Sequence, residues 1–153
     1  MKLDELTAGR GLRLNKTMHF CYSAEELYAA LGCGAFLPEG SECVGYLFDT
    51  GSFHFDGSFR GVDYRFDLQK KGSFSEALLS TPTHEDEQWV YVSRGQPLLL
   101  SLGSEQCLIH TALEQAYLTV TLPYPAADAE GSGISGVLLE SLADSIHWDR
   151  IEG

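Results

Sequence analysis

The sequence predicts a single α+β domain, in which antiparallel β-meanders carry two or three helices packed on the sheet. Residues 44–68 alternate apolar and polar side chains with a period of two, which indicates strands with one buried and one exposed face. Dipeptides that end in glycine separate the apolar runs, and glycine is the residue that tight hairpin turns favour. Stretches with helical spacing lie before, between and after the strand-rich segments, and this order is typical of an antiparallel sheet with helices on it.

Length and composition agree with one domain over residues 1–153. A chain of 153 residues can bury a substantial core, and 44% hydrophobic with 21% charged residues is ordinary for a globular protein. We find no internal repeat and no boundary for a second domain. The polar residues 1–16 form a possible loose N-terminal arm.

The first helix has clear start and stop signals. A short strand is expected over residues 17–22. Ser23 and Glu26 then match the S-x-x-E capping box, which satisfies free N–H groups at a helix start. Gly32 follows Leu31, and glycine commonly ends a helix. A helix over residues 23–31 is therefore predicted.

Residues 44–68 predict a meander of two or three antiparallel strands. The expected turns are at Thr50–Gly51, Asp56–Gly57 and Arg60–Gly61, where glycine supplies the positive φ of tight turns.

The second half repeats this organisation. Ser73 and Glu76 form another capping box, which predicts a short helix that Pro82 ends. Strands are expected over residues 89–93, 98–102, 107–110 and 117–122, with a turn at 94–97. Residues 123–136 are rich in Pro, Gly and Ser and predict a mobile loop. Apolar residues at helical spacing from Leu138 to Ile146 predict a C-terminal helix.

The net charge of −12 is the strongest compositional feature, and it is unevenly distributed. Between residues 72 and 149, Arg94 is the one basic residue against eleven Asp and Glu residues. Such a field repels nucleic acid and anionic membranes and attracts a protein with a basic surface. No apolar run reaches the roughly 18 residues of a membrane span, and residues 1–16 lack the apolar core of a secretory signal. We therefore expect a cytoplasmic protein with reduced, mostly buried cysteines.

An aromatic residue beside acidic residues is typical of an interface anchor with a polar rim. The sequence places Trp89 next to an acidic segment, and the predicted partner-binding residues are Glu85, Asp86, Glu87 and Trp89. The five histidines show no ligand spacing, so we expect no metal site and no cofactor.

In its acidic charge and in the expected order of its helices and strands, the chain resembles two kinds of protein. Immunity proteins that neutralise toxin nucleases are often small acidic α+β domains, and type III secretion chaperones are acidic with helices and strands in a similar order. The resemblance implies a non-catalytic module that covers a basic surface on a toxin or a secreted effector, with an immunity (antitoxin-type) protein preferred.

An enzymatic alternative depends on one motif. The apolar run 46–48 leads into Asp49, Thr50, Gly51 and Ser52, which resembles the active-site motif of aspartic proteases. That chemistry needs two facing carboxylates, so the resemblance implies a homodimeric, retroviral-type protease with Asp49 catalytic. A plain hairpin turn is the competing interpretation.

Overall fold

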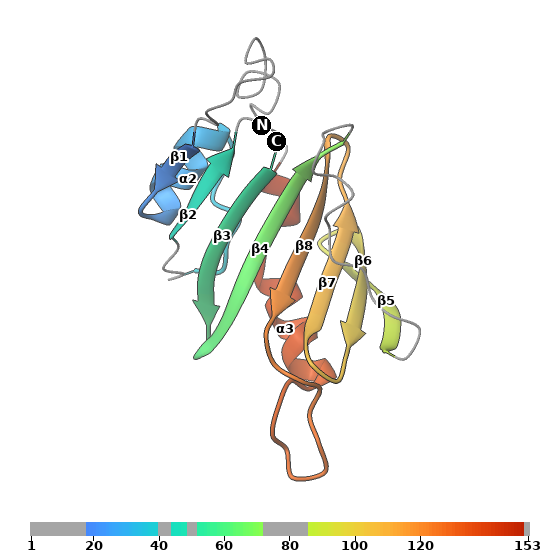
Figure 1. Cartoon of the computed structure of the whole chain (residues 1–153). Helices are drawn as coiled ribbons and strands as arrows, with labels where there is room; N and C mark the ends of the chain where they lie inside the picture. Colours follow the sequence, from blue (N-terminus) through green and yellow to red (C-terminus); the bar gives the residue numbers. More distant parts are fainter. Residues whose placement is uncertain (1–17, 40–43, 49–51, 72–85, 152–153) are drawn as a thin grey trace.

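The computed structural model describes residues 18–39, 44–48, 52–71 and 86–151, and the description below concerns these residues (Figure 1). They form one eight-stranded sheet in the order β1-β2-β3-β4-β8-β7-β6-β5, in which all paired neighbours are antiparallel. The elements are β1 (Met18–Cys21), α2 (Ala24–Leu31), β2 (Val44–Phe48), β3 (Ser52–Phe59), β4 (Val62–Lys70), β5 (Glu87–Ser93), β6 (Gln96–Leu102), β7 (Cys107–Ala112), β8 (Ala116–Leu122), α3 (Gly136–Ser145) and the 3-10 turn η2 (Trp148–Arg150). The α+β class predicted from the sequence is confirmed.

Two meanders of four strands make up this sheet. Strands β1 to β4 follow one another in space, and β5 to β8 do the same in the opposite spatial direction. The two meanders join where β4 pairs with β8, and Phe66 stands opposite Val120 at this seam. One continuous sheet therefore spans both halves of the described chain.

Two similar hairpin turns organise the meanders. Arg60 and Gly61 have φ angles of 51° and 78°, and Arg94 and Gly95 have 49° and 79°. Positive φ at both central residues defines the tight hairpin turn whose twist matches that of its strands. The predicted turn at Arg60–Gly61 is confirmed, and the turn predicted within 94–97 is confined to its first two residues.

The turn predicted at Asp56–Gly57 is wrong, because β3 continues through it. Asp56 pairs with Arg65 and Gly57 with Tyr64 across the hairpin. The two-residue turn at Arg60–Gly61 already sets this register, so a glycine earlier in the strand has a cross-strand partner and no turn to make.

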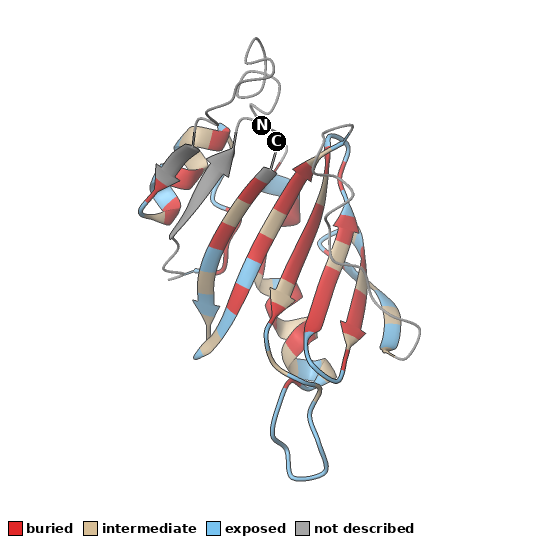
Figure 2. Cartoon of the chain, viewed as in Figure 1, coloured by how far each residue is buried: buried red, intermediate tan, exposed pale blue. Residues whose placement is uncertain are grey.

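The core lies between one face of the sheet and the two helices (Figure 2). Phe66 sits near its centre, with ring centroids 5.4 Å from those of both Phe36 and Phe55. Leu27 and Leu31 of α2 and Leu139 and Leu142 of α3 join the same core. We call the face of the sheet opposite this core the outer face.

Both predicted helices with described residues are confirmed. Ser23 Oγ accepts from the N–H of Glu26, and Gly32 ends α2 in the left-handed conformation at φ 69°. Ser135 caps α3 in the same way, accepting from the N–H of Leu138. The predicted arm at 1–16 and the helix predicted after Ser73 lie outside the described residues.

The segment after α3 fastens the two halves together. The N–H of His147 donates to the carbonyl of Phe36 at 2.8 Å, and the N–H of Gly34 donates to the carbonyl of Arg150 at 3.3 Å. Arg150 Nη1 also donates to the carbonyl of Ala35 at 3.1 Å. The end of the described chain is thus hydrogen-bonded to the segment that follows α2.

The loop after β8 projects beyond the end of the sheet (Figure 1). Its base is held by a parallel bridge between Ala126 and Ile134 and by a 2.8 Å hydrogen bond from the N–H of Ala126 to the carbonyl of Gly103. The mobility expected for residues 123–136 stays a prediction. In the described part of the chain, no helix has the length and apolar character needed to cross a membrane.

Candidate partner-binding surface

One end of the second meander gathers acidic side chains from three separate segments. Pairing of Glu87 with Leu102, Leu102 with Cys107 and Cys107 with Leu122 brings the start of β5, the β6–β7 turn and the loop after β8 to the same end of the sheet. Residues 86–87, 103–106 and 123–135 contain no Lys, Arg or His. We call this the acidic end, and its charged residues are Asp86, Glu87, Glu105, Asp128 and Glu130.

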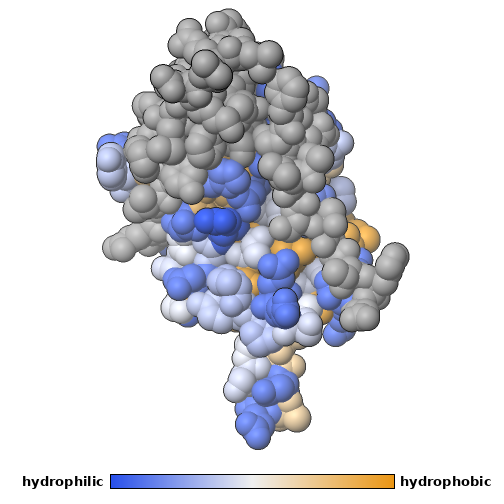
Figure 3. Space-filling model, in the orientation of Figure 1, coloured by the Kyte–Doolittle hydropathy of each residue, from blue (hydrophilic) through white to orange (hydrophobic). Residues whose placement is uncertain are grey.

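Most of these carboxylates are available to a partner. Glu87, Glu105 and Glu130 are exposed. Asp128 instead shapes its own loop, because its Oδ1 accepts from the N–H groups of Glu130 and Ser132 at 2.9 and 3.0 Å. The projecting loop is largely hydrophilic at its tip (Figure 3). The acidic end is therefore a partly preformed surface.

Of the four predicted partner-binding residues, the structure describes three, and it places Trp89 apart from Asp86 and Glu87. Asp86 and Glu87 belong to the acidic end, and Asp86 Oδ2 accepts from Ser101 Oγ at 3.1 Å. Glu85 lies outside the described residues. Trp89 faces the core side: a Cβ on Gly136 of α3 would lie 3.6 Å from its ring, so the half-buried indole packs on the domain itself. Its role as an interface anchor stays a prediction.

Strand β5 forms one edge of the described sheet and carries exposed apolar side chains. Val90 is 72% exposed and Val92 64% exposed. Both lie on the outer face, beside Leu99 and Pro97 of β6, respectively. Apolar surface is visible at this edge of the molecule (Figure 3). We call these four residues the valine strip, which sequence reasoning missed because alternation alone does not show which strand ends a sheet.

The opposite face of β5 is fastened to α3. Asp144 accepts from the hydroxyl of Tyr91 at 2.7 Å and from that of Ser93 at 2.8 Å. The hydrogen bond to Asp144 raises the pKa of Tyr91 to about 12, because it favours the protonated phenol. Arg94 Nε donates to the carbonyl of Asp144 at 3.2 Å. The edge strand is thus held in place from behind while its valines face outward.

A depression with a volume of about 690 Å³ adjoins the acidic end on β3, β4 and β8. Its charged lining residues are Asp56, Asp63 and Arg65, and Arg65 Nε lies 3.4 Å from Asp56 Oδ1. The hydroxyl of Tyr124 accepts from the N–H of Asp63 at 3.2 Å, which ties the start of the projecting loop to β4. Two carboxylates and one guanidinium leave this depression net negative.

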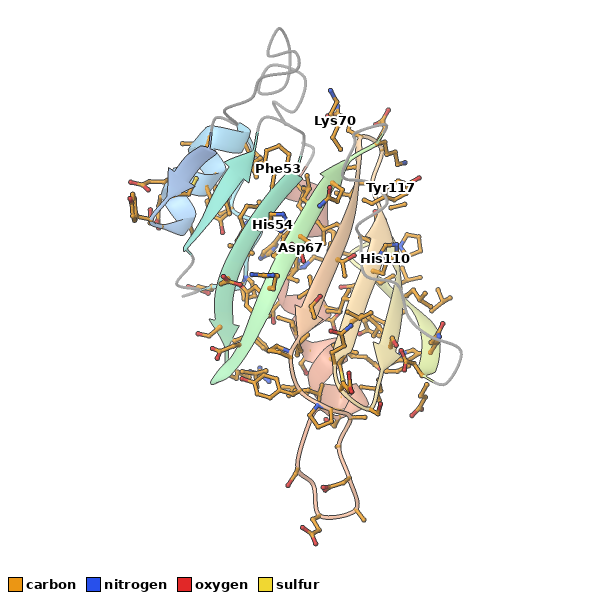
Figure 4. The ribbon with its side chains drawn as sticks, viewed as in Figure 1. Phe53, His54, Asp67, Lys70, His110 and Tyr117 are labelled. Atoms are coloured by element: carbon orange, nitrogen blue, oxygen red, sulfur yellow. The ribbon has the colours of Figure 1, made fainter. Side chains whose placement is uncertain are left out.

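A row of polar side chains crosses the outer face (Figure 4). His54 Nδ1 pairs with Asp67 Oδ1, and His110 Nδ1 lies 2.9 Å from Thr119 Oγ1. The register places Asp67 opposite Thr119, so the two pairs are contiguous. Burial lowers the pKa of His110. We interpret the row as cross-strand pairing that stabilises the sheet; among the described residues, no three His, Cys, Asp or Glu side chains could hold a metal ion together.

The described cysteines are free thiols without signs of activation. Cys21 and Cys107 are buried and Cys33 is half-buried. Burial raises the pKa of all three thiols, that of Cys33 to about 11, so they are protonated at neutral pH. Of the protease motif, Asp49, Thr50 and Gly51 lie outside the described residues, and that alternative stays a prediction.

No family model, no curated protein and no solved structure matches this chain.

Proposed function

We propose that this protein is a non-catalytic protein-binding module whose acidic end covers a basic surface on a partner protein. The observation that carries the proposal is the convergence of five acidic and no basic side chains from three segments on the acidic end. A surface with one sign of charge attracts an oppositely charged partner and accelerates its association. The adjoining net-negative depression offers a place for a cationic side chain.

An immunity protein that neutralises a toxin is the form of this function that we prefer, and a secretion chaperone is the second form. Both are analogies of charge and layout. The protonated state of Cys21, Cys33 and Cys107 supports a binding role over thiol catalysis. The partner would be a toxin or a secreted effector with a basic surface, met in the cytoplasm.

The test begins by capturing and identifying partners from the host lysate, then purifying the main basic partner. Surface plasmon resonance across a salt series should show association that slows as salt rises. Replacing Glu87, Glu105 and Glu130 together with Lys should slow association about tenfold or more, because rim charges act mainly on the association rate.

A matched control changes the same amount of charge elsewhere. Glu25, Glu39 and Asp149 are exposed acidic residues outside the acidic end, and their joint replacement with Lys should slow association much less. Equal slowing by both triple variants would mean that only net charge matters and would refute the acidic end as the binding surface.

Expression of the partner alone then separates the two forms of the function. Growth arrest by the partner, relieved by this protein, would identify an immunity protein. A partner that is harmless but degraded or not secreted without this protein would identify a chaperone.

A further inference from the structure

We propose that the projecting loop is a preformed binding element that enters a concave, basic site on the partner protein. The loop comprises residues 123–135, and we call residues 127–133 its tip. Figure 1 shows the loop extending beyond the end of the sheet. The inference rests on the proposed function and deepens it, because it names the part of the acidic end that the partner encloses and the shape of the surface that receives it.

The chain does not need the tip of the loop to connect β8 with α3. Ala126 and Ile134 form a bridge, and the N–H of Ile134 donates to the carbonyl of Pro125 at 2.9 Å. The chain therefore returns to the point from which it left. Every residue of the tip is exposed, whereas Ile134 is 2% exposed and belongs to the core. Because the tip adds little to the core or to the connection, we attribute its structure to recognition.

Hydrogen bonds within the loop fix its shape. The N–H of Ala127 donates to the carbonyl of Ile134 at 2.8 Å. The N–H of Asp128 donates to the carbonyl of Ser132 at 2.9 Å, and the Asp128 carboxylate accepts from the N–H groups of Glu130 and Ser132. The exposed tip thus satisfies several of its own backbone groups. Composition predicts mobility for this segment, whereas the proposal predicts order, so one measurement distinguishes the two.

Closure of the loop requires glycine at position 133. Gly133 has a φ of 98°, which side chains rarely adopt, and a Cβ there would lie 2.5 Å from the carbonyl oxygen of Pro125. It would also lie 2.7 Å from the carbonyl oxygen of Ala126. The two sides of the loop therefore meet backbone to backbone at this position. A side chain here would force them apart without any change in charge.

The base of the loop is anchored on two sides. The N–H of Ala126 donates to the carbonyl of Gly103 in the β6–β7 turn at 2.8 Å. The hydroxyl of Tyr124 accepts from the N–H of Asp63 on β4 at 3.2 Å. The loop therefore has a fixed direction relative to the sheet. A binding element that is already ordered loses little conformational freedom on association.

The shape and charge of the loop select the kind of partner. A flat surface would contact the tip alone, whereas stable interfaces bury about 800 Å² on each side, so a cleft that encloses the loop fits better. Glu130 lies within the tip, and Glu105 is in the β6–β7 turn beside the base. The depression that adjoins the base, lined by Asp56, Asp63 and Arg65, is also net negative. The cleft and its rim should therefore carry Lys and Arg.

The first test measures order in the free chain and needs no partner. Nitrogen-15 NMR relaxation should give order parameters near about 0.85 for residues 127–133, as in a rigid backbone. Gly133→Ala should lower them below about 0.6. Gly95→Ala is the control, because a Cβ there meets no atom within 4 Å and the β5–β6 turn lies at the other end of the sheet. Order parameters below about 0.6 in the native chain would overturn the preformed loop.

The second test uses the basic partner identified above and surface plasmon resonance. Replacing residues 127–133 with Gly-Gly should raise the Kd at least about tenfold, mainly through faster dissociation. The matched control, Asp128→Asn with Glu130→Gln, removes the same charges but keeps the shape, because the amide oxygen of Asn can still accept the two N–H bonds. This control should raise the Kd less. Equal effects of both variants would mean that the loop contributes charge alone and would overturn the inference.

Circular dichroism establishes whether the shortened chain is folded. If it is not, Gly133→Ala takes its place, since it keeps every charge of the loop, and it should raise the Kd at least about fivefold through the lost order. An unchanged Kd in the folded shortened chain, or in Gly133→Ala, would overturn the inference.

Failure of this inference can be told apart from failure of the proposed function. Glu87→Lys with Glu105→Lys changes the acidic end outside the loop. If that pair slows association while the loop variants change neither rate, the acidic end binds the partner and the loop does not enter it. If no basic partner binds, or if no variant changes the rates, the proposed function fails and this inference fails with it.

Discussion

The two meanders share an architecture but differ in what they present to solvent. Among the described residues, each has four strands, one α-helix and one Arg–Gly hairpin turn, and the φ angles of the two turns agree within a few degrees. In the first meander, the Arg60 guanidinium lies 4.9 Å from the centroid of the Phe59 ring, and the sheet ends in the short β1. In the second, Arg94 binds the carbonyl of Asp144, and the sheet ends in the long β5.

This comparison shows that the same type of hairpin turn can occur in meanders whose surfaces differ. The turns set the register in both meanders, while the acidic end, on which our proposed function depends, belongs to the second meander. The following predictions test whether the two meanders behave as one folding unit and where they differ.

The largest expected effect is at the seam between the meanders. Phe66 is fully buried and contacts Phe36 and Phe55, so Phe66→Ala should lower the free energy of unfolding by about 3–5 kcal/mol. Trp89 and Trp148 are the two tryptophans of the chain, and both belong to the second half. The unfolding transitions in urea that tryptophan fluorescence and far-UV circular dichroism report should therefore have the same midpoint.

Coincident transitions would show one cooperative unit despite a mutation in the first meander. A fluorescence midpoint unchanged by Phe66→Ala would contradict this and indicate two separate domains. Val137→Ala, at an exposed site on α3, is the control and should change stability by less than about 0.5 kcal/mol.

The two hairpin turns should respond equally to loss of glycine. Gly61 and Gly95 have φ of 78° and 79°, and a Cβ on either would meet no atom within 4 Å. Gly61→Ala and Gly95→Ala should thus each cost about 1–2 kcal/mol, from backbone conformation alone. Urea titration of both variants measures this. A cost near zero at one position would mean that its turn can rearrange.

A smaller effect is expected where β5 is fastened to α3. Ser93 is 1% exposed, and its hydroxyl contacts Asp144 Oδ1 and the carbonyl of Ala143. Ser93→Ala should lower stability by about 1 kcal/mol and increase hydrogen exchange in β5. Ser104→Ala, in an exposed turn, is the control. Exchange in β5 that does not change would show that α3 does not restrain this edge.

The smallest effect is on the titration of Tyr91, which lies on β5 in the second meander. The hydrogen bond to Asp144 raises its pKa from 10 to about 12, so the native state binds this proton more tightly than the unfolded state does. The stability it contributes is present below pH 10 and is lost as pH rises towards 12. Ultraviolet titration should show one late tyrosine, which Asp144→Ala moves back towards 10. A late tyrosine that persists in Asp144→Ala would contradict the assignment.

Local signals in the sequence predicted the local structure well. Ser23 and Gly32 set the ends of α2 as expected, and alternation identified the faces of the strands. The pairing of β4 with β8 could not be predicted, because a period of two shows which residues share a face but not which strand is the neighbour. The wrong prediction of a turn at Asp56–Gly57 has a related cause. A glycine forms a turn only where its residues have no partner on the neighbouring strand, and here Asp56 and Gly57 both pair with β4.

The candidate site was predicted only in part for the same reason. Asp86 and Glu87 are adjacent in the sequence, so their charge was evident. Glu105 and Glu130 join them only through the register of β5 to β8. The orientation of Trp89 depends on its packing against Gly136, 47 positions further along the chain, which no local pattern shows.

The hydrogen bonds of His147 and Arg150 to residues 34–36 also bear on how this chain is made. The side chain of Arg150 donates a hydrogen bond to the carbonyl of Ala35, which lies 115 positions earlier in the chain. Residues 34–36 are therefore synthesised long before their partner. The first meander cannot obtain these contacts until strands β5 to β8 and helix α3 have all been synthesised. We therefore expect the core beside α2 to stay incomplete until His147 and Arg150 have been synthesised. The nascent chain should be most sensitive to proteases during this interval.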